Sequence, residues 1–424
     1  MRAAHTLFLV ATAVALVAAA SCTGLKEGEQ VDAGTAGSPE GEGGSEDAPT
    51  GDGAAGDGAA GDAGGCASSC NAPMKSVCNG GTSKTTLSPG RCEKGQCVYP
   101  EVTRPCKAGS CRDGLCEELT WSVEYGGATT SLYSIWGTAP DDVWASGDGV
   151  FHYDGSRWSP VDVGVSFGAS GARAFAVSGT SRDDVALLVG NVNSPGTHEL
   201  RRRSAGRFGP VANIPCNIAG GALFELSPRE FFVHCGSSGV FRVGVGEPVP
   251  VTKIVLNPGS FPGGGSQPLT NGLSPLLFED GELQLMIAGG SGTGSGSFFY
   301  SSEDGGRTSS GGPSAVSVMN AKDVFGFLET GLTASLYPTD GGPSARFPLN
   351  ESIGETEGYW RSLVGTGRRR IFAGGSRGVI ARHDGLVWSR EAVPDAGSGT
   401  PIVSMWASPW GDVFAAGKHV WQGK

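Results

Sequence analysis

The 424-residue sequence has few of the residues and patterns that build metal sites and hydrolytic sites. Its six histidines, one of them at position 5, show no metal-ligand spacing. The zinc-protease pattern His-Glu-x-x-His and a phosphate-binding P-loop are both absent. These absences exclude the common zinc hydrolases and P-loop nucleotidases, so we expect no metal and no cofactor.

Long helices are not expected either. Glycine accounts for 72 residues and aromatic side chains for only 8% of the chain, a composition that disfavours helices of any length. The sequence is instead rich in short apolar runs separated by turn residues. In residues 132–161 four such runs are separated by Ala-Pro-Asp-Asp, Gly-Asp-Gly and Asp-Gly-Ser. Four short strands within about thirty residues predict one blade of a β-propeller.

The blade pattern recurs along the chain. The apolar run after the first turn begins seven times, at Val143, Val185, Phe231, Leu285, Val324, Ile371 and Val413. These starts are separated by 42, 46, 54, 39, 47 and 42 residues. A period near forty with four strands per unit is typical of propellers. We therefore predict an all-β fold, with a propeller of about seven four-stranded blades at residues 119–424.

The two ends of this segment predict how the ring closes. The last unit, Met405–Lys424, ends about one strand short of a full blade. Residues Leu119–Tyr125 precede the first blade and resemble a fourth strand. We expect this N-terminal strand to complete the C-terminal blade, because closure removes an exposed sheet edge.

Residues 1–21 have the pattern of a signal peptide. Arg2 is followed by an apolar run of about fourteen residues, which is short for a membrane span and typical of a signal-peptide core. The run ends in Ala19-Ala20-Ser21-Cys22, which resembles the bacterial lipobox except that Ala19 replaces the usual Leu. The resemblance implies a lipid on Cys22 and membrane attachment through that lipid. The alternative is ordinary cleavage nearby, which leaves Cys22 as a free thiol.

The segment 22–65 is predicted to be a disordered acidic linker. After Cys22 it contains ten acidic residues, one lysine and no aromatic residue, so it cannot offset the entropy cost of ordering. A flexible coil of this length reaches about 35 Å. The segment carries a net charge of −9 out of −11 for the chain. The overall acidity therefore belongs to the linker, and we expect no nucleic-acid partner.

The cysteine count predicts an oxidised, extracytoplasmic protein. Of eleven cysteines, setting Cys22 aside leaves an even number, ten, which suits four disulfides plus one. Eight lie in residues 66–118, at Cys66, Cys70, Cys78, Cys92, Cys97, Cys106, Cys111 and Cys116. This segment has few large apolar residues, so disulfides are predicted to replace a core. Structural zinc is the alternative, but the segment lacks histidine and the Cys-x-x-Cys spacing.

The remaining two cysteines lie within the propeller. Cys216 and Cys235 flank a predicted hairpin turn. We expect them to form a disulfide that staples one blade, contributing about 3 kcal/mol in the chain-entropy picture.

Three sets of polar residues are predicted to be structural. The acids of the recurring turn, such as Asp142, are expected to hydrogen-bond nearby backbone amides, with a functional acidic site as the alternative. His152 and His383 are expected to occupy matching strand positions. The arginine triplets 201–203 and 368–370 are expected to be solvated charge at strand ends or turns, with an anion site as the alternative.

Two resemblances support the propeller. Residues Ser302–Thr308 resemble the Asp-box turn of sialidase-type propellers, although Ser309 replaces the Trp of that motif. The similar segments His152–Trp158 and His383–Trp388 are expected at the same place in their blades. The whole arrangement resembles predicted myxobacterial-type lipoproteins, in which an acidic linker and Cys-rich loops precede a WD40/Asp-box-like β-propeller. This resemblance implies an outer-membrane lipoprotein that faces the periplasm or the cell surface.

We expect a membrane-anchored binding or scaffold module without catalysis, whose partner is an unknown protein or glycan. The alternative is an extracellular glycan-acting hydrolase or lyase of the sialidase-like type. That family uses arginines spread over several blades and an Arg-Ile-Pro element, and the sequence lacks this element. Acids and a tyrosine converging at the central channel would favour the enzyme, whereas serine and glycine there would favour binding.

Overall fold

The computed structural model describes residues 75–424 with internal gaps, and its side chains are described outside 273–348. The gaps are 87–90, 94–95, 100, 107–109, 113, 127–130, 169–170, 195, 217–220, 236–237, 247–250, 255–272, 278–282, 292–293, 302–306, 311–315, 321–322, 328–332, 339–344, 350–359, 368–369, 395–399 and 409. The predicted signal peptide, the predicted lipidation site Cys22 and the predicted linker lie outside the described residues, as do Cys66 and Cys70. The chain divides into two units, Met1–Ala63 and Gly64–Lys424, and all described strands belong to the second.

The Cys-rich segment forms a small β module. One sheet pairs its strands in the order β1 (Lys75–Asn79), β2 (Thr82–Thr86) and β5 (Glu101–Pro105). Two hairpins are added by β3 (Arg91–Glu93) with β4 (Gln96–Val98) and by β6 (Cys111–Arg112) with β7 (Leu115–Cys116). Disulfides join Cys78 to Cys111 and Cys106 to Cys116. Cys97 is also disulfide-bonded and lies opposite Cys92 in the β3–β4 hairpin.

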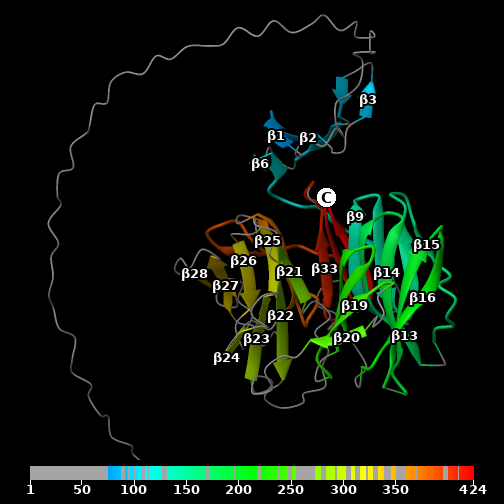
Figure 1. The fold of residues 1–424 in the computed structure, drawn as a ribbon. Coiled ribbons are helices and arrows are strands. Elements are labelled where there is room, and N and C mark those ends of the chain that lie inside the picture. The colour runs from blue at the N-terminus through cyan, green and yellow to red at the C-terminus, as the bar shows by residue number, and fades with distance from the viewer. Residues whose placement is uncertain are drawn as a thin grey trace, which may run out of the picture. The chain divides into compact units, whose positions relative to one another are not determined.

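The rest of the described chain is a β-propeller, which confirms the predicted fold (Figure 1). Its first three blades are β9 (Leu132–Ala139), β10 (Asp142–Gly147), β11 (Val150–Tyr153) and β12 (Trp158–Pro160); β13 (Ala172–Ser181), β14 (Asp184–Asn191), β15 (His198–Ser204) and β16 (Arg207–Ile214); and β17 (Ala222–Ser227), β18 (Glu230–His234), β19 (Val240–Gly244) and β20 (Val251–Ile254).

The next three blades follow the same plan. They are β21 (Leu273–Leu277), β22 (Leu283–Ser291), β23 (Gly294–Ser301) and β24 (Arg307–Ser310); β25 (Val316–Asn320), β26 (Asp323–Phe327), β27 (Thr333–Pro338) and β28 (Ala345–Pro348); and β29 (Trp360–Gly367), β30 (Arg370–Gly375), β31 (Ile380–His383) and β32 (Trp388–Arg390).

The seventh blade contains strands from both ends of the propeller. It pairs β33 (Ser404–Ala407), β34 (Val413–Ala416) and β35 (His419–Gly423) with the N-terminal strand β8 (Trp121–Gly126). The first strand of each blade is its inner strand. Each inner strand lies beside the inner strand of the next blade, and β33 of the last blade lies beside β9 of the first (Figure 1). The described strands therefore form a closed ring of seven four-stranded sheets, with the closing blade that the sequence predicts.

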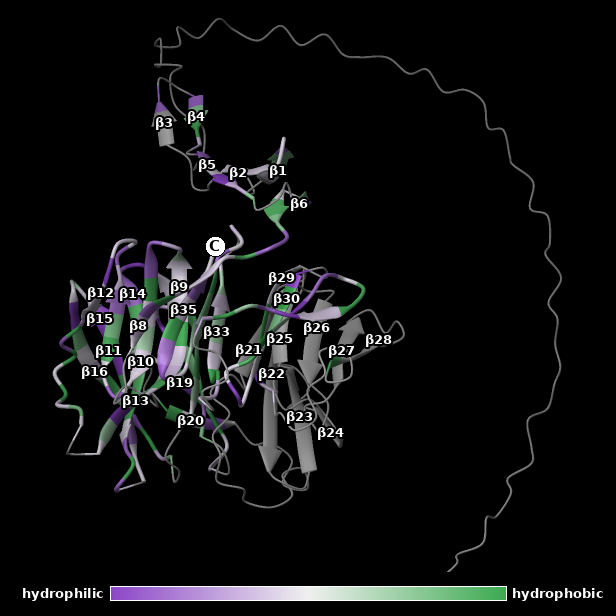
Figure 2. Cartoon of the chain, turned by 180° about the vertical axis from the view of Figure 1, so that it is seen from behind, coloured by the Kyte–Doolittle hydropathy of each residue, from purple (hydrophilic) through white to green (hydrophobic). Residues whose placement is uncertain are grey.

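The core lies between neighbouring blades. The second strand of a blade is covered on both faces, so β10 and β30 are buried along their whole length. This burial explains why the sequence shows short continuous apolar runs there and not a strict alternation. In Figure 2, hydrophobic residues, drawn in green, lie along the strands of the described blades.

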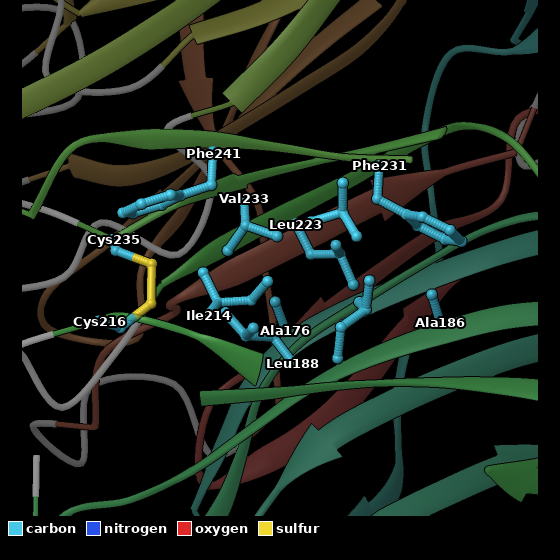
Figure 3. Close-up of a cluster of buried hydrophobic side chains, with 12 residues drawn as sticks. Ala176, Ala186, Leu188, Ile214, Cys216, Leu223, Phe231, Val233, Cys235 and Phe241 are labelled. Atoms are coloured by element: carbon cyan, nitrogen blue, oxygen red, sulfur yellow. A yellow bond between two sulfur atoms is a disulfide. The ribbon is translucent and has the colours of Figure 1, made fainter. Parts of the chain in front are cut away.

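Cys216 and Cys235 form a disulfide, but their place in the fold differs from the prediction. Cys216 lies in the connection just after β16, the outer strand of blade 2, whereas Cys235 directly follows β18 in blade 3. The bond therefore links two blades and does not staple one. It lies at the edge of the buried cluster that both blades share, with Leu188 and Ile214 from one side and Val233 from the other (Figure 3).

Candidate functional site: two faces of the ring

The ring has two faces that differ in their chemistry. In each blade the end of the first strand and the start of the second strand lie on one face, which we call the turn face. The end of the second strand and the start of the third strand lie on the opposite face, which we call the connection face. Since neighbouring strands are antiparallel, strand register alone assigns a residue near a strand end to one face or the other.

The turn face carries a repeated pair of side chains. We call the residue directly before the apolar run of the second strand the acid position. It is occupied by Asp142, Asp184, Glu230, Arg370 and Asp412 in blades 1, 2, 3, 6 and 7. The second-strand residue two places after the acid position pairs with a residue of the third strand, and we call this third-strand residue the base position. It is occupied by His152, Arg202, Arg242, Arg382 and Gln422.

In blades 1 to 3 the two positions form a pair within the blade. The Asp142 Oδ1 atom lies 2.7 Å from Nε2 of His152. The Arg202 Nε donates to Asp184 at 2.5 Å, and the Arg242 Nε donates to Glu230 at 2.6 Å. Two of the acids also accept a hydroxyl four residues earlier, from Thr138 to Asp142 and from Thr180 to Asp184. Each of these two threonines is the extra residue of a β-bulge.

These acids are structural, but the predicted partner was wrong. They bind side-chain hydroxyls and cations of their own blade, whereas the sequence predicted backbone amides. Burial on its own would raise the pKa of Asp142, but the hydrogen bonds from His152 and Thr138 and the charge of Arg182 outweigh it, and the pKa lies below its usual range. At Asp184 the opposing effects of burial and Arg202 also end in a lowered pKa.

Backbone amides do bind the acids of the outer hairpin turns. The Asp154 Oδ1 atom accepts from the N–H groups of Ser156 and Arg157. Asp384 accepts from Leu386 and Val387 in the same way. The segments of Asp154 and Asp384 therefore occupy equivalent turns, as expected from their resemblance to each other. The Asp-box candidate, Ser302–Gly306, lies outside the described residues.

His152 and His383 do not occupy matching positions, contrary to the prediction. His152 lies opposite Trp144, whereas His383 lies opposite Ile371. By register the counterpart of His383 is Tyr153, which lies one residue after His152. A shift of one residue moves a side chain to the other face of a strand, and His383 is 1% exposed.

The first arginine triplet is buried or paired along a strand, so the prediction of solvated charge at turns was wrong. Arg201, Arg202 and Arg203 lie within β15. Arg201 is 9% exposed and donates to Glu199. Arg203 pairs with Asp183 and stacks its guanidinium 5.5 Å above the Trp144 ring. In the second triplet the described residue, Arg370, is 8% exposed.

A buried carboxyl at the interface of blades 2 and 3 was not predicted. At two other interfaces a tryptophan of one inner strand packs on a glycine of the next. A Cβ on Gly137 would lie 3.1 Å from the Trp406 ring, and one on Gly179 would lie 2.5 Å from the Trp136 ring. At the equivalent place blades 2 and 3 have Ser178 and Glu225 by register. The smaller serine leaves room for a side chain at the position where blades 1 and 2 have Gly137 and Gly179.

The surroundings of Glu225 favour its protonated, neutral form. Its side chain is fully buried, with Arg202 3.9 Å from Oε1. Burial, followed by the charge of Asp184, raises its pKa to about 9. Among the inner strands with described side chains, Glu225 is the one buried residue with an ionisable side chain. Its nearest partners are an aspartate and an arginine, without a tyrosine, so this group does not match the sialidase-like arrangement of acids and tyrosine.

The turn face is different at blades 6 and 7. Blade 7 has Gln422 at its base position, and its acid, Asp412, is paired with Arg104 of the Cys module at 2.6 Å. Blade 6 has arginine at both positions. Arg370 donates at 2.6 Å to the carbonyl oxygens of Cys116 and Gly411, and burial lowers its pKa to about 10.

The connection face has polar side chains that form no hydrogen bond or ion pair with other described residues. Three inner strands carry an extra residue at the same register position, namely Tyr133, Phe175 and Arg361. Such bulges re-aim side chains and are common near functional sites. Tyr133 is half-buried and stacks on Phe175 with ring centroids 6.0 Å apart. Arg361 is also half-buried. Within the described residues, neither the Tyr133 hydroxyl nor the Arg361 guanidinium has a hydrogen bond or an ion pair.

Other functional motifs do not take on a catalytic geometry. Gly374–Gly378 fits the hydrolase pattern Gly-x-Ser-x-Gly, but it forms the hairpin turn between β30 and β31, whereas the hydrolase motif requires a strand-to-helix turn. In the described part of the chain, no three His, Cys, Asp or Glu side chains gather as metal ligands would. Among the same residues, no helix is long and apolar enough to cross a membrane.

Comparison with known proteins supports the fold. No family model and no curated protein matches the chain. Solved propeller structures do match. YCF48 bound to D1 peptide has a TM-score of 0.52 and 11% identity, over 72% of this chain and 96% of its own. YCF48 from Cyanidioschyzon merolae has a TM-score of 0.51 and 14% identity, over 71% of this chain and 98% of its own.

A third match is the extracellular domain of BT4673 from B. thetaiotaomicron. Its TM-score is 0.50 and its identity 12%, over 72% of this chain and 40% of that chain. At identities this low the likeness shows the fold alone.

Proposed function

We propose that the chain is an extracytoplasmic lipoprotein whose propeller binds a protein ligand at the connection face and serves as a binding or scaffold module without catalysis. The observation that carries the proposal is that Tyr133 and Arg361 lie on inner-strand bulges and that, among the described residues, neither polar group forms a hydrogen bond or an ion pair. Tyrosine and arginine are the residue types enriched at the energetic centres of protein interfaces. The turn face, in contrast, uses the charges at its described acid and base positions within the fold or for the Cys module.

Two further observations support this proposal. One of the similar propellers is described with a bound peptide, and another is an extracellular domain. The disulfides of the module and of blades 2 and 3 suit an oxidising compartment. The myxobacterial-type lipoproteins that the sequence resembles imply the same placement, at the outer membrane.

The binding proposal is tested with purified protein starting at residue 23. Peptide arrays and glycan arrays serve as probes. We expect binding to peptides, weakened at least about tenfold by Tyr133→Ala and by Arg361→Ala. Arg157→Ala, an exposed residue on the turn face, is the matched control and should leave binding unchanged. Peptide binding that survives both connection-face substitutions would rule out this site. Cleavage of an arrayed glycan would support the sialidase-like alternative.

Membrane attachment is tested separately at Cys22. If Cys22 carries the lipid, the full-length protein partitions into the detergent phase, and Cys22→Ala moves it to the aqueous phase. Cys216→Ala, which removes a disulfide cysteine, is the control and should not change the partitioning. Unchanged partitioning of the Cys22→Ala protein would contradict the anchor.

A further inference from the structure

The closing seam of the ring is where β8 and β35 complete blade 7 beside blade 6. At this seam the N-terminal strand of the propeller joins the C-terminal blade without a covalent bond, through the ladder between β35 and β8. The two blades at this seam also lack the acid–base pairs that blades 1 to 3 form within themselves. Blade 7 has an acid without a base of its own, and blade 6 has two arginines.

The Cys module provides what these two blades lack. Asp412 is 1% exposed and its carboxylate is paired with Arg104, which lies on β5. Arg370 donates to the carbonyl of Cys116, the last residue of the module. The disulfide between Cys106 and Cys116 holds these two contacts together, because Arg104 lies two residues before Cys106.

The strand that follows the module is tied to blade 6 as well. The indole N–H of Trp121, at the start of β8, donates to Glu391 at 3.0 Å. Glu391 also accepts from Arg382 at 2.9 Å, which neutralises the second arginine of blade 6. Leu119 and Trp121 pack in one buried cluster with Phe372 and Ile402. Charges and apolar contacts therefore converge on the same seam.

Without the module these blades would keep buried charges that have lost their partners. Asp412 would lose its cation and Arg370 one of its two carbonyl acceptors. Removing one partner of a buried pair is strongly unfavourable, because the other charge stays desolvated. The pairs of blades 1 to 3 would not be affected, since each is complete within its own blade.

We propose that the Cys module is the built-in counter-charge partner of blades 6 and 7 and holds the closing seam of the ring shut. When these contacts are lost, β8 and β35 open locally while blades 1 to 3 stay folded. The module is a structural part of the ring, although the sequence alone suggests an independent disulfide-rich domain. This inference does not depend on the proposed ligand or on the lipid anchor.

The test compares two arginines of the module in the otherwise intact chain. Arg104→Met keeps much of the side-chain volume and removes the charge that faces Asp412. We expect it to lower the melting temperature by about 5 °C. Arg112→Met is the matched control, because Arg112 is 54% exposed and its pair with Glu117 is long, at 3.4 Å. The control should melt like the unmodified protein.

Amide hydrogen exchange locates the effect. In the Arg104→Met protein, exchange should accelerate in β8 and β35 and stay unchanged in blades 1 to 3. A uniform acceleration, or a melting temperature equal to that of the control, would overturn the proposal.

A second variant covers the case in which Arg104→Met does not fold. Adding Asp412→Asn removes the stranded carboxylate and should recover folded protein or part of the lost melting temperature. If the double variant recovers neither folded protein nor melting temperature, the proposal is wrong, because the loss would then not come from the unpaired carboxylate.

Discussion

The Ser404 hydroxyl in the last blade accepts a hydrogen bond from the backbone N–H of Ile135 in the first blade, at 3.1 Å. The same contact joins blades 1 and 2, where Ser134 accepts from Val177 at 3.3 Å. By register, Ser404 and Ser134 are equivalent residues of their inner strands. The interface between blades 7 and 1 therefore contains the same inter-blade hydrogen bond as the interior interface between blades 1 and 2.

Deleting residues 118–124 should unfold or aggregate the whole propeller. The deletion removes most of β8 together with Trp121, leaves β35 as a bare edge, and exposes Trp421 and the rest of its apolar cluster. Circular dichroism and light scattering during a thermal ramp measure the outcome. Deleting residues 23–65 is the control and should leave the melting temperature unchanged. A deletion of 118–124 that still melts cooperatively at the original temperature would contradict the closure.

Gly137→Ala should destabilise the interface of blades 7 and 1 by about 1–3 kcal/mol. The new Cβ would lie 2.8 Å from the backbone oxygen of Asp142 and 3.1 Å from the Trp406 ring, so backbone and indole must both shift. Gly209→Ala in β16 is the matched control, because nothing lies within 4 Å of its Cβ position. Chemical denaturation compares the two, and equal midpoints would show that the Trp–Gly contact is not needed.

The regular features of this fold could be predicted from the sequence because each blade encodes them locally. A turn with an acid, a short apolar run and a second turn are repeated often enough to give the number of blades. The missing last strand and the extra strand before residue 132 then indicate the closure. The strand β8 and its pairing with β35 are as predicted.

The features that could not be predicted depend on contacts between distant residues. The run Arg201–Arg203 looks like solvated charge, and only the register of β15 against β14 brings Arg202 to Asp184. In the sequence, Glu225 resembles an ordinary surface acid. Its burial follows from the register, because Ser178 occupies the position where a tryptophan packs at two other interfaces. Arg104 has no local signal at all, because its partner Asp412 comes from the other end of the chain.

Replacing both Cys216 and Cys235 by serine should lower stability by about 3 kcal/mol in the chain-entropy picture. The disulfide spans 19 residues and links blade 2 to blade 3. Because both cysteines are fully buried, serine also loses apolar contact at the edge of the shared cluster. Guanidinium denaturation measures the loss, and non-reducing mass spectrometry of the unmodified protein checks that neither thiol is free. A double variant as stable as the parent would show that the bond between the blades adds nothing.

Glu225→Gln should stabilise the protein increasingly as the pH rises from about 4.5 to about 9. The folded state keeps the Glu225 proton up to a pKa of about 9, whereas the unfolded chain releases it near pH 4.3. The unfolded state therefore binds fewer protons in this range, and the stability of the unmodified protein falls with rising pH. Glutamine has no proton to release and avoids that loss.

The expected gain at pH 7.5 is about 2 kcal/mol or more, since each unit of pKa difference corresponds to about 1.4 kcal/mol. Denaturation of both proteins at pH 4.5, 6, 7.5 and 9 gives the difference as a function of pH. At pH 4.5 the two proteins should be nearly equal in stability, which controls for any change in packing. A difference that does not vary with pH would mean that Glu225 is ionised in the folded protein. The carboxylate would then be stabilised by Arg202, and the interface of blades 2 and 3 would contain an ion pair in place of a neutral acid.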